Sequence, residues 1–575
     1  MKRFLAFLLS LTTVLGLAVS PDGASLSFRE PQSFFYLPLL ILTAYGLNHI
    51  FHESGKRLKA FSFCLSLFLS ICHLFGGLLA QKGTILWLFR DVQTLLLGIL
   101  TLFSYTVLLF CLVFYAFRFL ARANPAHGRL PEIPAWGFWL LLVIAWIPWF
   151  LNQYPAVMTA DTSDQLEMAL GLEPLTNHHP VFYTFLLKGF LWLGTLITKG
   201  GQNANQTGIA LFCCVQLLVM AAAYAAVLRV IWRNTSSDAL RIGSLLFFMF
   251  YPVHPLYSVT VWKDVPFAVC LLLLIVLLAC ELKEHSAGYC IGMALCGILL
   301  SLLRHNGIYL IILALPFLPG AFKGRWKPVL LSFLAVILVF AGLRVLLKWQ
   351  KIPDGRASEA FSLPLQQIAL TAKRQHAAMD EELLAELNSY FMVDEIWERY
   401  TYRISDPVKN VFNEELYSSD RGKFWKFWLV LGILYPQDYI DALMLHTYGY
   451  WYPETPHWVF ITGIDDNGLF DIRMDPKQGA EWMNDPVKWL SDSGYDRIPL
   501  LSLLFSPGAC FWVCLTAFWY CVYRRSPAYI LFIPLFILWL TALASPVNCE
   551  YRYVYAMFAA IPLLLSALPV GLRSR

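Results

Sequence analysis

The chain has 575 residues, of which 58% are hydrophobic, 16% are aromatic and only 14% are charged. Because a soluble domain has about 25% charged residues, this composition excludes a soluble enzyme, a disordered chain and a basic nucleic-acid-binding protein. The apolar residues occur in blocks of roughly 17 to 25, the length that crosses a bilayer core of about 30 Å. We therefore predict an all-α, multi-pass membrane protein.

The net charge of +5 is unevenly distributed along the chain. Residues 349–498 contain 24 acidic and 14 basic residues, so this segment carries −10 and the remainder carries +15. A long acidic segment is typical of a water-facing domain, whereas a basic surplus in short loops is typical of membrane anchoring. We predict that residues 349–498 form an exterior insert, mixed or mainly helical, in a membrane-embedded body.

In chain order, the apolar segments predict about 14 transmembrane helices. They lie near residues 1–20, 34–49, 60–80, 93–117, 136–151, 208–228, 242–259, 265–280, 288–303, 306–319, 328–347, 499–522, 527–544 and 553–571. This order divides the chain into four parts. They are accessory helices (1–135), a transmembrane core (136–348) with a first exterior loop (152–207), the exterior domain (349–498) and C-terminal transmembrane helices (499–575).

One further apolar segment, residues 181–197, is either a membrane span or a helix lying in the interface. If it stays in the interface, 19 of the 29 Lys and Arg residues outside the insert lie in cytoplasmic segments. If it crosses, most of those downstream face outward, against the positive-inside rule. We therefore predict an interfacial helix, both termini in the cytoplasm, the insert outside, and the cell membrane as the location.

This topology collects the few polar residues of the body on the exterior side. In the first loop, Asp161 is a candidate helix N-cap and Asp164 lies one turn later on the same side. Two interpretations stay open: a capping residue beside a solvated one, or a general base beside a metal or substrate ligand. The pair His178-His179, which precedes Pro180, is typical of a turn and is a second candidate part of the site.

Three later exterior turns carry the other candidates. Lys263-Asp264 precedes one predicted span, and Arg304-His305-Asn306 joins two others. Arg552 lies just outside the last span. Asp264 either caps a helix or faces the first loop, and each arginine either extends to the interface or binds a phosphate, for which a guanidinium is well suited.

Several stretches resemble the GT-C superfamily of membrane glycosyltransferases, including the protein O-mannosyltransferases and the aminoarabinose lipid A transferases. These stretches are residues 159–183 with the acidic loop and His-Pro, 262–267 with the later Asp, 304–308, and 435–453 of the insert. The resemblance lies in the order of the stretches and in the side of the membrane that they share. They look like an uncharacterised bacterial branch, and the resemblance covers roughly residues 136–571.

The resemblance implies transfer of a sugar, with inversion, from a polyprenyl-phosphate donor to an exterior glycan, lipid or protein acceptor of the cell envelope. Asp161 matches the family's general base, and Lys263, Arg304 and Arg552 are then candidates for binding the donor phosphate. The family's Asp-Glu pair is missing because Thr162 follows Asp161, so Asp164 is the candidate for the second acidic role. If a divalent cation, Mg²⁺ or Mn²⁺, takes part, its candidate ligands are Asp161, Asp164 and Asp264.

Two other function classes remain as alternatives. A transporter or flippase of a lipid-linked glycan would show internal repeats and charges at mid-membrane, whereas the charges here lie at outer helix ends. A non-catalytic scaffold in envelope assembly has no need for a group of acids and arginines. The chain has no nucleotide-binding motif of the P-loop or dinucleotide type. We expect the lipid bilayer as a partner, and no nucleic acid.

Overall fold

The computed structural model describes residues 1–22, 25–28, 36–122, 130–453, 458–464 and 468–568. Within these residues, seven helices are long and apolar enough to cross a membrane. They are α3 (Lys56–Lys82), α4 (Val92–Arg122), α5 (Ala135–Asn152), α7 (Val181–Thr198), α8 (Ala204–Asn234), α11 (Asp264–Glu281) and α15 (Trp326–Trp349). The prediction of a helical membrane protein is confirmed in this form. A short hairpin of β1 (Val19–Asp22) and β2 (Ser25–Phe28) is an exception to the all-α expectation.

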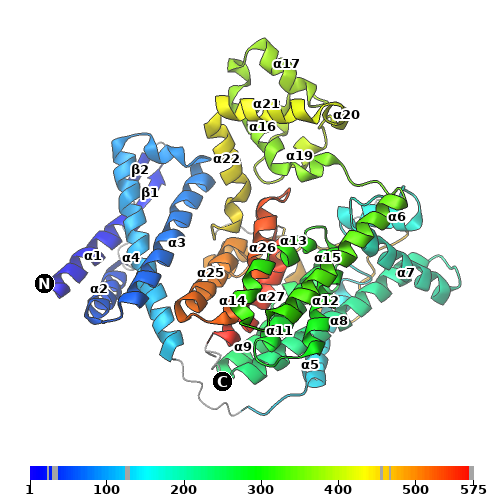
Figure 1. The fold of residues 1–575 in the computed structure, drawn as a ribbon, viewed down its shortest axis with the longest axis horizontal. Helices are drawn as coiled ribbons and strands as arrows, with labels where there is room; N and C mark the ends of the chain where they lie inside the picture. Colours follow the sequence, from blue (N-terminus) through cyan, green and yellow to red (C-terminus); the bar gives the residue numbers. More distant parts are fainter. Residues whose placement is uncertain (23–24, 29–35, 123–129, 454–457, 465–467, 569–575) are drawn as a thin grey trace.

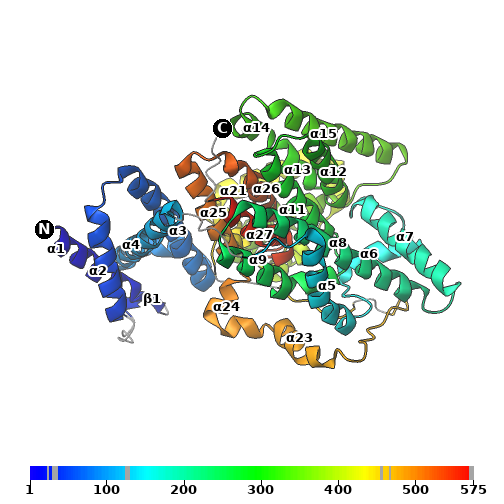
Figure 2. The same ribbon diagram turned by 90° about the horizontal axis from the view of Figure 1, so that it is seen from below.

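The N-terminal helices α1 (Lys2–Leu17), α2 (Tyr36–His52), α3 and α4, with η1 (Leu86–Phe89), stand beside the main body in both views (Figures 1 and 2). Small residues let these helices approach closely, as is typical of helix packing in membranes. A Cβ on Gly16 of α1, for example, would lie 2.0 Å from the Ser104 Oγ of α4. The unit contacts the body through α3 and α4. The Trp519 indole, for example, donates to the Phe61 carbonyl at 2.9 Å.

The body surrounds two buried helices, α11 and α27 (Tyr551–Ala567). Around them lie α5, α7 and α8, together with α15 and a set of shorter elements. These are α6 (Ala160–Leu170), α9 (Asp238–Phe250), α10 (Val253–Ser258), α12 (Ala287–Leu303), α13 (Gly307–Ile312), η2 (Leu315–Phe317), α14 (Leu318–Phe322), α24 (Pro499–Leu503), α25 (Pro507–Arg524), η8 (Pro527–Leu531) and α26 (Ile533–Leu543). Their apolar faces form one continuous core.

The prediction of continuous helices over 242–259, 306–319 and 499–522 is wrong, because each is interrupted. Proline explains all three breaks, since its ring removes a backbone donor and restricts the preceding residue. Pro252 separates α9 from α10, Pro316 lies in the 3₁₀ segment between α13 and α14, and Pro507 begins α25 after α24. Apolar composition alone did not reveal these breaks.

Helix α8 gives the body a reference direction. Near its middle, Gln216 donates to the Thr260 carbonyl at 2.8 Å, just before α11 begins. At its C-terminus, Arg233 pairs with Glu284 at 3.0 Å, just after α11 ends. The first three turns of α8 therefore project beyond the end of the body at which α11 begins. We call this the Asp264 end, after the first residue of α11.

Both ends of α7 lie at this Asp264 end. The residue before Pro180, His179, contacts Lys263 there. The C-terminal half of α7 packs on the projecting first turns of α8, so closely that a Cβ on Gly194 would lie 2.2 Å from the Ala204 carbonyl oxygen. Although α7 has the length and apolar composition of a span, it does not run alongside α11 through the body. This geometry favours the interfacial prediction for residues 181–197.

The predicted exterior domain, 349–498, divides into two parts. Its first part has its own hydrophobic core; it contains η3 (Ala357–Ala360), α16 (Ser362–Gln375), η4 (His376–Ala378), α17 (Glu381–Ser389), α18 (Ile396–Arg399), α19 (Asp406–Lys409), α20 (Glu414–Ser419), α21 (Arg421–Leu434), α22 (Pro436–Thr447) and η5 (Tyr448–Tyr450). In the second part, η6 (Glu481–Met483), α23 (Asn484–Ser491) and η7 (Gly494–Arg497) follow an extended stretch. Many of its buried apolar residues belong to the core of the body, along one side of which α23 runs (Figure 2).

Candidate functional site

Backbone contacts bring the first loop and the loop before α11 together. The Val157 amide donates to the Val259 carbonyl, and the Val261 amide donates to the Val157 carbonyl, both at 2.9 Å. Side chains add to this junction, because Thr162 Oγ1 donates to the Val261 carbonyl at 2.7 Å and the Trp262 indole donates to Thr159 Oγ1, also at 2.7 Å. The two loops therefore form one rigid platform at the Asp264 end.

The predicted capping roles of Asp161 and Asp264 are wrong. Thr159 is the N-cap of α6 and forms a capping box with Thr162, while Asp161 lies in the first turn. Lys263 occupies the N-cap position of α11, and Asp264 is its first helical residue. Because other residues occupy the cap positions, both carboxylates are free to meet cations. Their place near helix N-termini also favours the negative charge.

Asp161 is the centre of a chain of charged side chains. Its Oδ2 lies 3.0 Å from Arg552 Nη1 and 3.6 Å from Lys263 Nζ. Lys263 Nζ in turn donates to His179 Nδ1 at 2.7 Å, and His179 Nε2 lies 3.7 Å from Asp164 Oδ2. Since Nδ1 accepts from an ammonium, the proton of a neutral His179 ring is on Nε2, facing Asp164.

A second ion pair lies beside this chain. Arg304 Nη1 is 2.5 Å from Asp264 Oδ1, and both side chains are nearly buried. The ring of Tyr553 joins the two groups, because the guanidinium carbons of Arg304 and Arg552 lie 5.0 and 5.3 Å from its centroid. Such cation–π contacts favour arginine over lysine at these positions. We call the set Asp161, Lys263, Asp264, Arg304 and Arg552 the charge cluster.

Burial and neighbouring charges shift the pKa values of Lys263, His179 and Asp161. Burial lowers the pKa of Lys263, although Asp161 and Asp264 act to raise it. Burial also lowers the pKa of His179, and the ammonium of Lys263 lowers it further, so the ring is neutral. For Asp161, burial acts to raise the pKa, but the charges of Arg552 and Lys263 outweigh it and hold the pKa well below its ordinary range. Asp161 is therefore an anion at every physiological pH.

Glu550 is a buried carboxyl group that the sequence placed on the outer face but not in the site. Its Oε1 lies 3.5 Å from Arg552 Nε, yet forms no hydrogen bond. Burial raises the pKa of Glu550 to about 7, against the charge of Arg552. Near neutral pH the three cations of the charge cluster therefore face two full carboxylates and one partly protonated acid. This leaves a surplus of positive charge, as an anion-binding site requires.

The opening of the site is at Asp161. Its side chain is 35% exposed, whereas those of Lys263, Arg304 and Arg552 are 14% exposed and that of Asp264 is 4% exposed. A molecule arriving from water therefore meets the carboxylate first and the cations behind it. This order suits an anion bound deep in the site and a second reactant bound at Asp161.

An apolar cavity of about 580 Å³ adjoins the charge cluster. It lies between α7, the end of α12 and the second half of α15, and Phe182, Phe185 and Leu347 contribute to its walls. Two of its lining residues, Pro180 and His305, are neighbours in sequence of His179 and Arg304. The cavity thus brings apolar surface to the edge of the polar site.

The remaining sequence candidates take supporting positions. His305 Nε2 donates to the Asn177 carbonyl at 2.9 Å, and Asn306 donates to Thr541 Oγ1 of α26 at 3.0 Å. The rings of His178 and His179 are tilted relative to each other with centroids 4.4 Å apart, and Asp164 is a rim residue that is 61% exposed. The structure therefore brings Asp161, His179 and the later cations together, but not His178, His305 or Asn306.

The carboxylates do not fit a divalent cation. Among the residues that the structure describes, no group of three or more His, Cys, Asp and Glu side chains could hold a metal ion. Asp161 and Asp264 are already neutralised by arginine, and Asp164 lies at the rim. The three predicted ligands Asp161, Asp164 and Asp264 thus do not form one coordination site.

The family of unknown function DUF6020 matches residues 172–570. The chain belongs to this family. The match includes Lys263, Asp264, Arg304 and Arg552, and it begins after α6, so Asp161 lies outside it. No curated protein and no solved structure matches the chain.

Glu550 predicts a pH-dependent stability. Because its folded pKa of about 7 exceeds the ordinary 4.5, the folded state binds more protons between these values, and stability falls as pH rises through this window. Across this window the wild type should lose on the order of 3 kcal/mol of its free energy of unfolding. We expect Glu550→Gln, which mimics the protonated acid, to avoid this loss. Melting temperatures of the detergent-solubilised variant and wild type should agree at pH 4.5 and diverge by pH 7.5. The control is Glu415→Gln in an exposed turn of α20, and parallel curves for Glu550→Gln and wild type would contradict the prediction.

Proposed function

We propose that this protein is a glycosyltransferase of the GT-C type, which transfers a sugar from a polyprenyl-phosphate donor to an acceptor of the cell envelope. The observation that carries the proposal is the charge cluster. Asp161, Lys263, Arg304 and Arg552 come from four distant segments and converge at one end of the body. A structural role would not require so many charges at one buried point, where each is costly unless paired or functional.

The cations suit a phosphate leaving group. When the bond between sugar and phosphate breaks, negative charge develops on the phosphate oxygens. Cations already in place stabilise that charge without reorganisation. Arg552 and Arg304 are both held against the ring of Tyr553, so two guanidinium groups are pre-oriented for the phosphate. The raised pKa of Glu550 adds to the positive surplus there.

Asp161 is the candidate general base for the acceptor hydroxyl. In the resting site, Arg552 and Lys263 hold its pKa low, although burial acts to raise it, so it is ionised but weakly basic. A donor phosphate would compete for these two cations. As they turn to the phosphate, the pKa of Asp161 would rise, and the base would gain strength once the donor is bound. A single displacement of this kind inverts the anomeric centre.

The apolar cavity beside the cluster suits the lipid part of the donor. Its walls are formed by Phe182 and Phe185 of α7 and by Leu347 of α15. A polyprenyl chain in this cavity would place its phosphate near Pro180 and His305, at the edge of the charge cluster. In this proposal α7 lies in the exterior interface, the charge cluster faces the cell exterior, both termini are cytoplasmic, and the apolar segments make about 14 spans.

The direct test is sugar transfer by the purified protein in lipid nanodiscs. Polyprenyl-phosphate donors carrying different radiolabelled sugars are supplied with envelope glycan, lipid or protein acceptors. We expect label in an acceptor with at least one donor, and a change in envelope glycans when the gene is deleted. Movement of an intact donor across the bilayer without transfer would instead favour a flippase. Unchanged glycans, together with the absence of transfer and movement, would favour a scaffold.

A further inference from the structure

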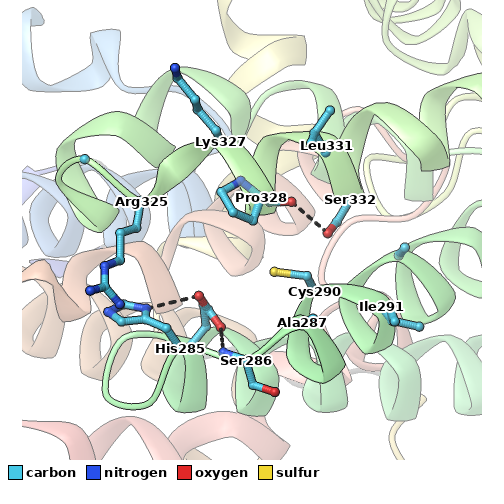
Figure 3. Close-up of a pocket in the computed structure, with 13 residues that line it drawn as sticks. His285, Ser286, Ala287, Cys290, Ile291, Arg325, Lys327, Pro328, Leu331 and Ser332 are labelled. Carbon is cyan, nitrogen blue, oxygen red and sulfur yellow. Dashed lines mark hydrogen bonds and ion pairs between the residues drawn. The ribbon is translucent and has the colours of Figure 1, made fainter.

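A second cavity, of about 800 Å³ (Figure 3), is lined by residues at the end of α11 farthest from Asp264. It is formed where α11 ends, α12 begins and α15 begins. The two sites are thus at opposite ends of α11, because Asp264 begins this helix and Glu281 ends it. An 18-residue helix is about 27 Å long, close to the roughly 30 Å of a bilayer core. The cavity therefore lies near the membrane surface on the other side.

The polar part of this cavity is basic. Arg325 and Lys327 line it, and neither side chain has a hydrogen bond or ion pair with another described residue. Figure 3 shows the Arg325 side chain extending toward His285 and the Lys327 side chain extending away from it. The positive N-terminal ends of α12 and α15 also face this region, which adds to its attraction for an anion.

The one carboxylate of the cavity is already occupied. Glu281 accepts hydrogen bonds from His285 Nδ1 and from the Ser286 amide, both at 3.1 Å. Its side chain is only 4% exposed. Glu281 therefore fixes the turn between α11 and α12 and positions His285. It does not neutralise Arg325 or Lys327, whose charges remain available to a ligand.

The rest of the cavity is apolar and continues onto exposed surface. Ile291 of α12 and Leu331 of α15 line it and are 62% and 65% exposed. Beyond it, Leu295 and Leu338 extend the same two helices with side chains that are 57% and 72% exposed. A ligand with an anionic headgroup and a hydrocarbon tail would contact both the basic part and the apolar part of the cavity, whereas a free anion would contact only the basic part.

We propose that this cavity is a binding site for one anionic phospholipid of the leaflet opposite the charge cluster. The phosphate headgroup lies at the basic end of the cavity, which Arg325 and Lys327 line, and an acyl chain follows the apolar surface of α12 and α15. Basic pockets between transmembrane helices are a general means of binding anionic headgroups. The bound lipid would hold the start of α15 against α12, and α15 forms a wall of the apolar cavity beside the charge cluster.

Native mass spectrometry of the full-length protein, released from detergent with titrated lipid, tests this site. We expect phosphatidylglycerol to bind with a saturable stoichiometry of one, and phosphatidylcholine to bind much more weakly. Removing one cation should weaken binding about 5-fold, so the double variant R325Q/K327Q should lose about 25-fold. The matched control is Arg524→Gln, an exposed arginine at the end of α25 that does not line the cavity.

Two further arms distinguish a lipid from a free anion. Ala294→Phe puts bulk into the apolar part of the cavity, so it should reduce phosphatidylglycerol binding. The melting temperature of this variant should stay unchanged. Inorganic phosphate should not compete at lipid concentrations that saturate the site. Equal binding of both lipids, equal binding by R325Q/K327Q, or full competition by phosphate would overturn the proposal. None of these outcomes depends on the proposed sugar transfer.

Discussion

Asp161→Asn is expected to lower the rate of sugar transfer by about 10²- to 10⁴-fold, the usual contribution of a positioned general base. The amide keeps the shape of the side chain but cannot take the proton of the acceptor hydroxyl. Because the same change removes the anion between Arg552 and Lys263, donor binding should be retained or tightened. The measurement is transfer in nanodiscs with the donor that is active for the wild type, together with the donor concentration at half-maximal rate.

The matched control for this prediction is Asp164→Asn. Asp164 lies one turn later on the same helix, but its side chain is 61% exposed and its one ion-pair partner among the described residues is His179, at 3.7 Å. We expect this variant to keep its rate within a few-fold of the wild type. Full transfer activity in Asp161→Asn would exclude Asp161 as the base. Equal losses in both variants would point to a general effect of α6 on the fold.

Arg304→Met is expected to destabilise the protein by about 3–5 kcal/mol, because it leaves Asp264 as a buried charge without its partner. Asp264 is 4% exposed and Arg304 14% exposed, so water replaces the lost interaction poorly. The double variant D264N/R304M removes both charges, and we expect it to recover most of the loss. The melting temperature of the detergent-solubilised protein measures the effect.

The exposed pair of Arg344 and Asp354 provides the control for this stability prediction. It is a bidentate pair with contacts of 2.9 and 3.0 Å, but its side chains are 44% and 66% exposed. Surface ion pairs contribute about 0–1 kcal/mol, so Arg344→Gln should hardly change the melting temperature. A loss in Arg304→Met no greater than in Arg344→Gln would show that the buried pair does not contribute to the fold.

Much of the helical architecture follows from local sequence. The predicted segments near 60–80, 93–117 and 265–280 correspond to α3, α4 and α11, since a long run of apolar residues has few structures available in lipid other than a helix. The breaks near Pro252, Pro316 and Pro507 do not follow from apolarity, because they depend on the backbone effect of proline. Asp161 is not the N-cap of α6, because Thr159 and Thr162 form a capping box at the start of this helix.

Composition and residue order are enough to identify a membrane protein, and the lysine and arginine pattern predicts that the scarce exterior charges share one face. Neither inference requires knowledge of contacts. The pairing of these charges follows from the packing of the helices: Asp161 with Arg552 and Lys263, Arg304 with Asp264, and the buried Glu550 beside them. Ion pairing and pKa values depend on distances of a few ångströms and on burial. Both are set by how helices hundreds of residues apart in sequence pack together.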